Sequence, residues 1–100
     1  MSMTAYRLFC VIAEERNMSR AAQQLHITPS AATHAMNALE RSLGFPLLNR
    51  DRNGVSLTSY GELLLPKFQA VLEEEERLRG EAAKINGLEQ GRIRLGVLDS

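Results

Sequence analysis

The sequence contains no tryptophan, a single cysteine and no apolar run long enough to span a membrane. The lone Cys10 excludes an internal disulfide and fits a reducing compartment, where we expect a packed thiol rather than a reactive one. Aromatic residues make up only 5% of the chain, so the core must consist mainly of aliphatic side chains and methionine. The first residues lack the basic region and apolar segment of a signal peptide, which favours a cytoplasmic location.

Clusters of residues typical of catalytic and metal sites are also missing. His26 and His34 lie eight residues apart, and no Cys/His or His/acid group has the spacing of metal ligands. The chain has no glycine-rich phosphate loop, and no spacing assembles a serine, a histidine and an acid into a catalytic set. We therefore expect no catalytic residue, no metal and no cofactor in this chain.

The formal net charge is zero, which excludes the strongly basic surface of many nucleic-acid-binding proteins. The charge is nevertheless unevenly distributed. Six arginines face four acids from Met1 to Tyr60, whereas six cations face eight acids from Gly61 onwards. Any affinity for phosphate must therefore come from a few well-placed arginines in the first part of the chain.

The stretch from Thr28 to Leu43 is predicted to be a helix with two faces of opposite kind. The apolar face consists of Ala32, Ala35, Met36, Leu39 and Leu43. The opposite face carries hydrogen-bonding groups, one permanent cation and no carboxylate, namely Ser30, Thr33, His34, Asn37 and Arg41. A merely solvated face usually mixes Glu with Lys, so this face is better suited to the hydrogen-bonding groups and phosphates of a DNA major groove.

Two shorter helical patterns precede this stretch. The first runs from about Thr4 to Glu15, with apolar residues at helical spacing. The second runs from about Met18 to Leu25 and can be capped by Asn17 or Ser19. A turn of only three residues then leads into the third helix, which predicts a helix-turn-helix. An ordinary corner between two helices would have the same pattern.

A hairpin is predicted directly after the third helix, which Gly44 ends. Strand patterns at 47–50 and 55–57 flank a turn that contains Asn-Gly, a strong hairpin signal. A hairpin in this place is a wing. Its tip is expected to carry three groups that can reach phosphates or a minor groove, Arg50, Arg52 and Asn53. The alternative is that these are solvated turn residues.

A long fourth helix is predicted from Ser59 to about Asn86, with Gly87 as its end and a bend at Pro66. Its apolar residues recur at alternating steps of four and three, interrupted by Glu75. Because so small a domain cannot cover this helix, a second copy is its simplest partner. The expected dimerisation residues are Gly61, Leu64, Phe68, Val71, Leu72, Leu78, Ala82 and Ile85. Beyond the helix, the alternation of Ile93, Leu95 and Val97 predicts a strand.

In this order, the motifs resemble the amino-terminal part of LysR-type transcriptional regulators. The resemblance rests on Phe9–Glu14, Ser19–Ala22 with Leu25, Ala31–Glu40, Leu43-Gly44, Leu47 with Arg50, and Leu57-Thr58 with Gly61. It implies a mainly α fold in which residues 1–58 form a winged helix-turn-helix of three helices and a two-stranded β wing. It further implies a dimerisation linker helix at 59–87, and over 88–100 a hinge and the first strand of an effector-binding domain absent from this chain.

The resemblance also implies a set of DNA contacts. Ser19 and Arg20 would meet phosphate at the start of the second helix, and Arg50 would serve the wing. The third helix would present to the major groove Thr28, Pro29, Ser30, Thr33, His34 and Asn37. Pro29 stands where the family often has Gln, and His34 and Asn37 replace residues that are commonly basic, which predicts weaker phosphate attraction.

The leading hypothesis is therefore sequence-specific binding of double-stranded DNA by a homodimer, as part of a bacterial transcription regulator in the cytoplasm. The full-length protein would be a dimer or a tetramer, and a small-molecule effector would bind the absent domain. The alternative is a helical dimerisation or protein-interaction module in which the helix-turn-helix is only structural. An enzyme is the weakest of the three hypotheses.

Overall fold

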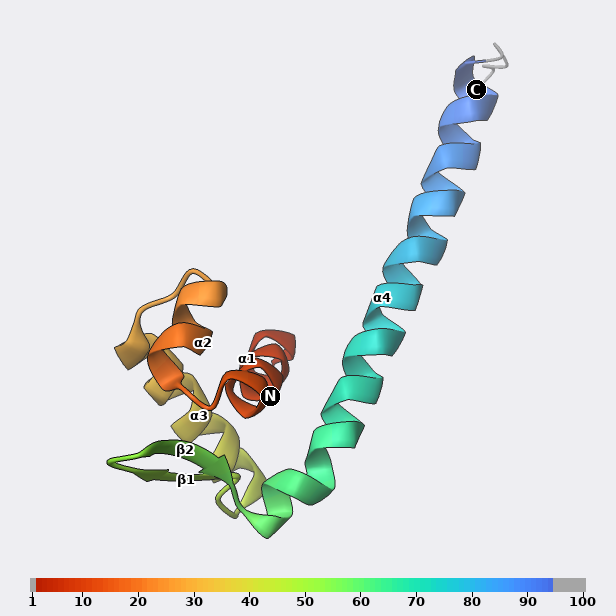
Figure 1. Cartoon of the computed structure of the whole chain (residues 1–100). Helices are drawn as coiled ribbons and strands as arrows, with labels where there is room; N and C mark the ends of the chain where they lie inside the picture. Colours follow the sequence, from red (N-terminus) through yellow and green to blue (C-terminus); the bar gives the residue numbers. More distant parts are fainter. Residues whose placement is uncertain (1, 95–100) are drawn as a thin grey trace.

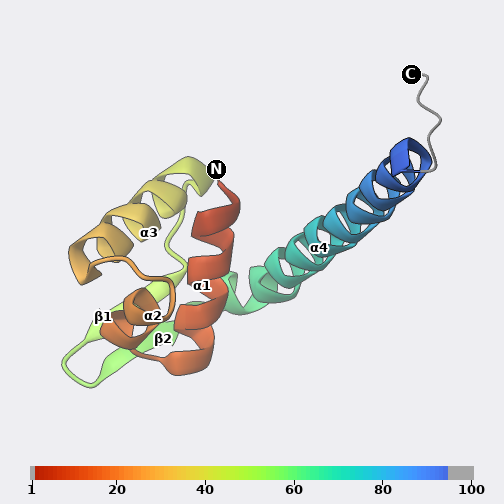
Figure 2. The same cartoon turned by 90° about the horizontal axis from the view of Figure 1, so that it is seen from above.

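The computed structural model describes residues 2–94. Three helices come first, α1 (Met3–Glu15), α2 (Met18–Gln24) and α3 (Pro29–Leu43). An antiparallel hairpin of β1 (Leu48–Asp51) and β2 (Gly54–Leu57) follows, and α4 (Ser59–Arg94) completes the described chain. The first three helices and the hairpin form one body, with α1 between α4 and the α2–α3 pair, and α4 leaves this body as a long arm (Figures 1 and 2). This is the predicted winged helix-turn-helix with a long helix after it.

Side-chain oxygens cap the helices at their amino ends. Asn17 rather than Ser19 caps α2, by accepting a hydrogen bond from the Arg20 amide at 2.9 Å. Thr28 caps α3, and Thr58 caps α4, where its hydroxyl accepts from the Gly61 amide at 3.0 Å. At the other end of α3, Gly44 adopts the left-handed conformation that ends the helix (φ 91°).

The core lies where α1 packs on α2, α3 and the first part of α4. Its largest fully buried side chains are Leu8, Phe9, Ile12, Met36 and Leu47. Phe68 of α4 completes this core, because its ring lies 5.0 Å from Tyr6 and 5.2 Å from Phe9, measured between ring centroids. Phe68 is only 7% exposed and packs within its own domain, so the prediction that it is a dimerisation residue was wrong.

Gly61 is also buried inside the domain, against the start of the wing. A Cβ atom on Gly61 would lie 2.3 Å from the Leu47 carbonyl oxygen, which already accepts a hydrogen bond from the Thr58 amide at 2.9 Å. The close approach that glycine permits here is therefore to the backbone of the same chain, and Gly61 has no surface to offer a second copy.

The fourth helix continues through Gly87 to Arg94, so its predicted end at Gly87 and the predicted strand at Ile93 were wrong. Leu95 and Val97 lie outside the described residues. A glycine inside a helix costs only about 0.5–1 kcal/mol, so Gly87 alone is not enough to end α4.

Pro66 lies inside α4, and the ribbon changes direction in this first part of the helix, as the loss of one backbone N–H predicts (Figure 1). None of the helices in the described part of the chain is both long and apolar enough to cross a lipid bilayer.

Candidate nucleic-acid interface

The polar face of α3 is held outward by the residues on its opposite side. Ala32, Met36 and Leu39 are at most 2% exposed and anchor the helix in the core. The residues predicted to face a major groove lie on the free side, where Thr33 is partly buried and the others are exposed: Thr28, Pro29, Ser30, His34 and Asn37. The two faces of α3 are thus separated as its sequence pattern predicts.

The start of α2, the first turns of α3 and the hairpin meet at a shallow hollow on the surface. Three predicted site residues from three different elements line it, Ser19, Thr33 and Arg50. Arg20 follows Ser19 and is exposed, and among the described residues no carboxylate lies within ion-pair distance of it. The fold therefore brings the predicted contacts of α2, α3 and the wing into one neighbourhood.

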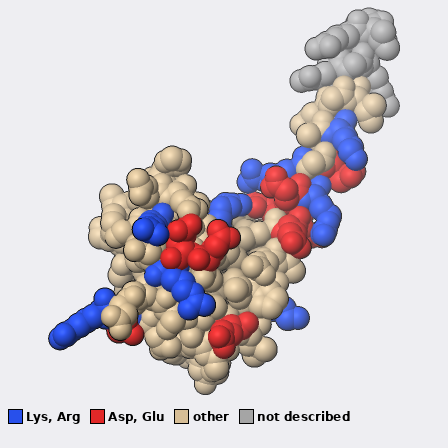
Figure 3. All heavy atoms as spheres, in the orientation of Figure 1, with Lys and Arg blue, Asp and Glu red and all other residues tan. Residues whose placement is uncertain are grey.

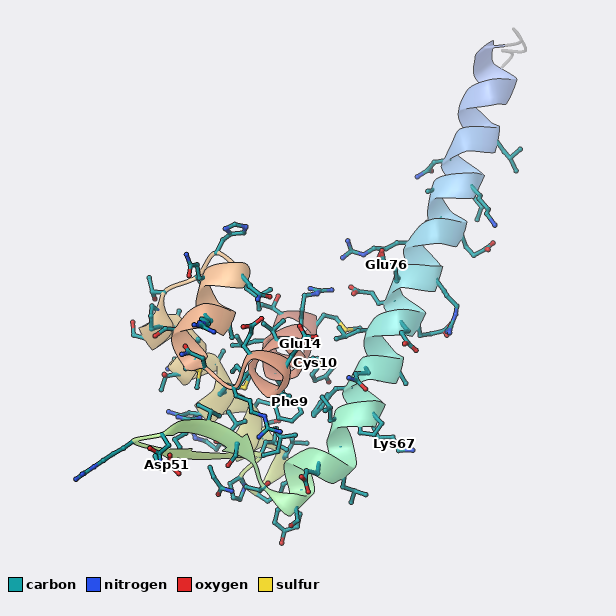
Figure 4. All side chains as sticks on the ribbon, viewed as in Figure 1. Phe9, Cys10, Glu14, Asp51, Lys67 and Glu76 are labelled. Atoms are coloured by element: carbon teal, nitrogen blue, oxygen red, sulfur yellow. The ribbon has the colours of Figure 1, made fainter. Side chains whose placement is uncertain are left out.

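The tip of the wing carries Arg52 and Asn53, both exposed. Asp51 shapes this turn, because its carboxylate accepts a hydrogen bond from the Asn53 amide at 2.8 Å, while Gly54 supplies a positive φ of 121°. Asp51 lies in the part of the hairpin farthest from α4 (Figure 4). Lys or Arg atoms project beyond the body at this tip (Figure 3), so the wing ends in positive charge.

Arg50 does not lie at the tip, which corrects one sequence prediction. It is a strand residue that pairs with Val55, and its guanidinium lies 3.5 Å from the carboxylate of Glu40 on α3. Its side chain is 32% exposed. Arg50 therefore has a carboxylate partner, whereas Arg52 has none among the residues that the structure describes.

Two further residues beside this surface were missed by sequence reasoning. Glu40 accepts hydrogen bonds from the Leu47 and Leu48 amides at the base of the wing. This contact depends on how α3 and β1 pack together, which the sequence does not show. Arg16 ends α1 with a positive φ of 55° and lines a second hollow with Asp51 and Asn53. The sequence signal for Arg16 was only its contribution to the positive charge of the first part of the chain.

The described residues contain no group of three or more His, Cys, Asp or Glu side chains that could hold a metal ion. Cys10 is half-buried on α1, and burial raises the pKa of its thiol while the nearby Arg7 opposes that rise.

Residues 3–62, which hold all three body helices and the hairpin, match the model of the bacterial regulatory helix-turn-helix protein, lysR family. The chain belongs to the LysR family. Among LysR-family relatives, it is 37% identical to the uncharacterized HTH-type transcriptional regulator YvbU of Bacillus subtilis, over the whole chain and 35% of that protein. It is 36% identical to the Hca operon transcriptional activator HcaR of Escherichia coli, over 85% of the chain and 29% of that protein. The chain thus spans about a third of the length of these relatives.

Solved LysR-family structures share the fold. The sequence is 33% identical to that of the protein in the crystal structure of the CbnR DBD–DNA complex, and the two folds match with a TM-score of 0.79. The match covers 87% of this chain and 99% of that one. Oxidised OxyR of Corynebacterium glutamicum is 34% identical with a TM-score of 0.82, covering 86% of this chain and 26% of that one. The mainly α, winged helix-turn-helix architecture predicted from the sequence is therefore confirmed.

Proposed function

We propose that this chain binds double-stranded DNA sequence-specifically, as the DNA-binding part of a LysR-type transcriptional regulator that acts as a homodimer. The observation that carries the proposal is the exposed, acid-free polar face of α3 beside a wing that ends in Arg52. Its support from comparison is the likeness to almost the whole CbnR DBD chain, which was solved in a complex with DNA. The role is regulatory rather than catalytic, and its place is the bacterial nucleoid in the cytoplasm.

The proposed contacts divide into those that position the protein and those that read bases. Arg20, Arg50 and Arg52 supply the phosphate contacts, with Ser19 at the start of α2 and Asn53 at the wing tip beside them. The residues of α3 that enter the major groove are Thr28, Pro29, Ser30, Thr33, His34 and Asn37. Because this set carries no permanent cation, base reading rests on short polar groups and on water, while the arginines supply the phosphate attraction.

The homodimer is proposed from the exposed apolar residues of α4. Val71, Leu78 and Ile85 recur every seven residues and are 40%, 66% and 59% exposed. Ala82 is exposed beside them. Large apolar side chains at this spacing are typical of a helix that pairs with another helix. Leu64 packs against the core of its own domain, so the proposed pairing surface begins farther along α4 than the sequence suggested. Leu72 is partly buried. The full-length regulator would then be a dimer or a tetramer controlled by a small-molecule effector.

The proposal is tested by selecting, from a pool of random DNA duplexes, those that the protein binds. We expect enrichment of one motif with two similar half-sites related by two-fold symmetry, because a symmetric dimer presents α3 twice. A protein-interaction module would enrich no motif, and its weak retention of DNA would not depend on sequence. That second result would overturn the proposed function.

A further inference from the structure

Glu40 lies in the last turns of α3 and points at the base of the wing. One oxygen of its carboxylate accepts two hydrogen bonds from consecutive backbone amides, those of Leu47 at 2.7 Å and Leu48 at 3.0 Å. The other oxygen lies 3.5 Å from the guanidinium of Arg50. A single side chain on the helix thus contacts the first residues of the wing in three places.

These contacts are shielded from solvent. The Glu40 side chain is 17% exposed, Leu47 is fully buried and Leu48 is 6% exposed. Charge-assisted hydrogen bonds in such surroundings are stronger than exposed ones, because water competes less for the carboxylate. The Glu40 contacts therefore restrain the wing far more than a surface ion pair would.

The segment that Glu40 contacts is also hydrogen-bonded to the residue that follows β2. The Leu47 carbonyl accepts from the Thr58 amide at 2.9 Å, and the Thr58 hydroxyl donates to the Pro46 carbonyl at 2.8 Å. The two ends of the hairpin are therefore tied to each other, and Glu40 ties this closed base to α3. Without Glu40, the Leu47 and Leu48 amides would lose the only side-chain acceptor they have in the described part of the chain.

We propose that Glu40 is a positioning residue for DNA binding, which holds the wing and Arg50 at a fixed place relative to the polar face of α3. It touches no DNA itself. Its effect is on specificity, since base contacts by α3 and backbone contacts by the wing must be made at the same time. This inference rests on the proposed function of the chain.

The positioning role of Glu40 can be distinguished from the direct effect of its negative charge on DNA affinity. A carboxylate beside a phosphate-binding surface repels DNA, so its neutralisation alone would strengthen binding to every duplex. Loss of positioning instead weakens binding only where the protein must fit a particular sequence. The ratio of affinity for the selected operator to affinity for a random duplex therefore reports positioning.

The test compares Glu40→Ala with Glu15→Ala in the full chain, using the selected operator and a random duplex. Alanine removes both the charge and the acceptor oxygens, whereas glutamine would keep an oxygen for the Leu47 and Leu48 amides. Glu15 is a second glutamate of the same domain whose carboxylate accepts from the Gln24 side chain at 2.6 Å, so this control removes the same charge without touching the wing. For Glu40→Ala we expect operator affinity to fall at least tenfold while random-duplex affinity is unchanged or higher. For Glu15→Ala we expect the ratio to stay as in the wild type.

A second readout excludes plain loss of folding. Amide exchange in the peptide spanning 45–52 should become faster in Glu40→Ala, while exchange in α1 stays as in the wild type. An unchanged affinity ratio with wild-type DNA binding would overturn the role of Glu40 alone. A parallel fall of both affinities with global loss of exchange protection would also overturn it, because Glu40 would then serve stability only. Absence of DNA binding by the wild type would overturn the proposed function and this role together.

Discussion

Glu75 on α4 accepts a hydrogen bond from Arg7 on α1 at 3.1 Å, although 68 residues separate them in the sequence. Arg79 donates to the same carboxylate at 3.2 Å, and the Glu75 side chain is only 14% exposed. This contact explains why a glutamate interrupts the apolar seam of the helix. Glu75 faces α1 rather than a second copy, and it joins the long helix to the domain beyond the aromatic contacts of Phe68.

A double-mutant cycle tests this link between the two helices. Arg7→Ala and Glu75→Gln should show a coupling free energy of about 0.2–1 kcal/mol in urea unfolding, the range for partly exposed pairs. The matched control combines Arg7→Ala with Glu74→Gln, because Glu74 pairs with Arg77 on the exposed side of the helix. Coupling in the control cycle equal to that of Arg7 with Glu75 would contradict the specific contact.

The packing of Gly61 on Leu47 predicts opposite effects for two glycine substitutions in one helix. Gly61→Ala should lower the free energy of unfolding by about 1–3 kcal/mol, because the added methyl group meets a backbone carbonyl that cannot move freely. Gly80→Ala should raise it by about 0.5–1 kcal/mol, since nothing lies within 4 Å of the added carbon and alanine favours the helix. Urea unfolding measures both. Equal effects would show that α4 does not approach Leu47 in this way.

The exposed apolar residues of α4 predict a change of oligomeric state without a change of fold. Leu78→Gln should weaken the homodimer at least tenfold in sedimentation velocity, because the 66% exposed side chain has no role in the monomer core. Arg77→Gln is the control, with a neighbouring side chain that is 65% exposed but polar. A dimer of unchanged strength in Leu78→Gln would exclude this face as the interface.

The thiol of Cys10 should be slow to react. Burial raises its pKa above the usual value of 9.0, so less thiolate is present at pH 8 than in the unfolded chain. Alkylation with iodoacetamide at pH 8 should therefore be slower in the folded protein than in urea. The protonated thiol stabilises the fold below pH 9.0, and this contribution is lost as the pH rises through the folded pKa. Equal alkylation rates in both states would contradict the burial.

Local signals in the sequence were enough to predict the elements of the domain. Helical spacing of apolar residues placed α1, spacing together with a capping residue placed α2 and α3, and Asn53-Gly54 placed the hairpin turn. These signals act over a few residues and depend little on the rest of the chain. The winged helix-turn-helix could therefore be predicted before any contact between elements was known.

Contacts between elements could not be predicted in the same way. The repeat along α4 shows which residues share a face, but not whether α1 or a second chain covers it, so Phe68 and Gly61 were assigned to the wrong surface. The pairing of Arg50 with Glu40 depends on how the wing is placed against α3, which no spacing encodes. The end of α4 depends on a neighbour for the predicted strand, and Gly87 alone did not stop the helix.

We propose that α3 reads bases while the wing holds phosphate. The most direct test is the affinity of Thr33→Ala and Arg52→Ala for the selected operator and for a random duplex, measured over a range of salt concentrations. Ser42→Ala serves as the matched control on α3, and Arg77→Ala serves as the matched control for charge on α4.

We expect Thr33→Ala to lose about 1–3 kcal/mol of binding free energy on the operator and little on the random duplex. Arg52→Ala should weaken both, with a salt slope smaller by about one unit. If both variants bound the operator as the wild type does, the account of this surface as the DNA-binding site would be contradicted.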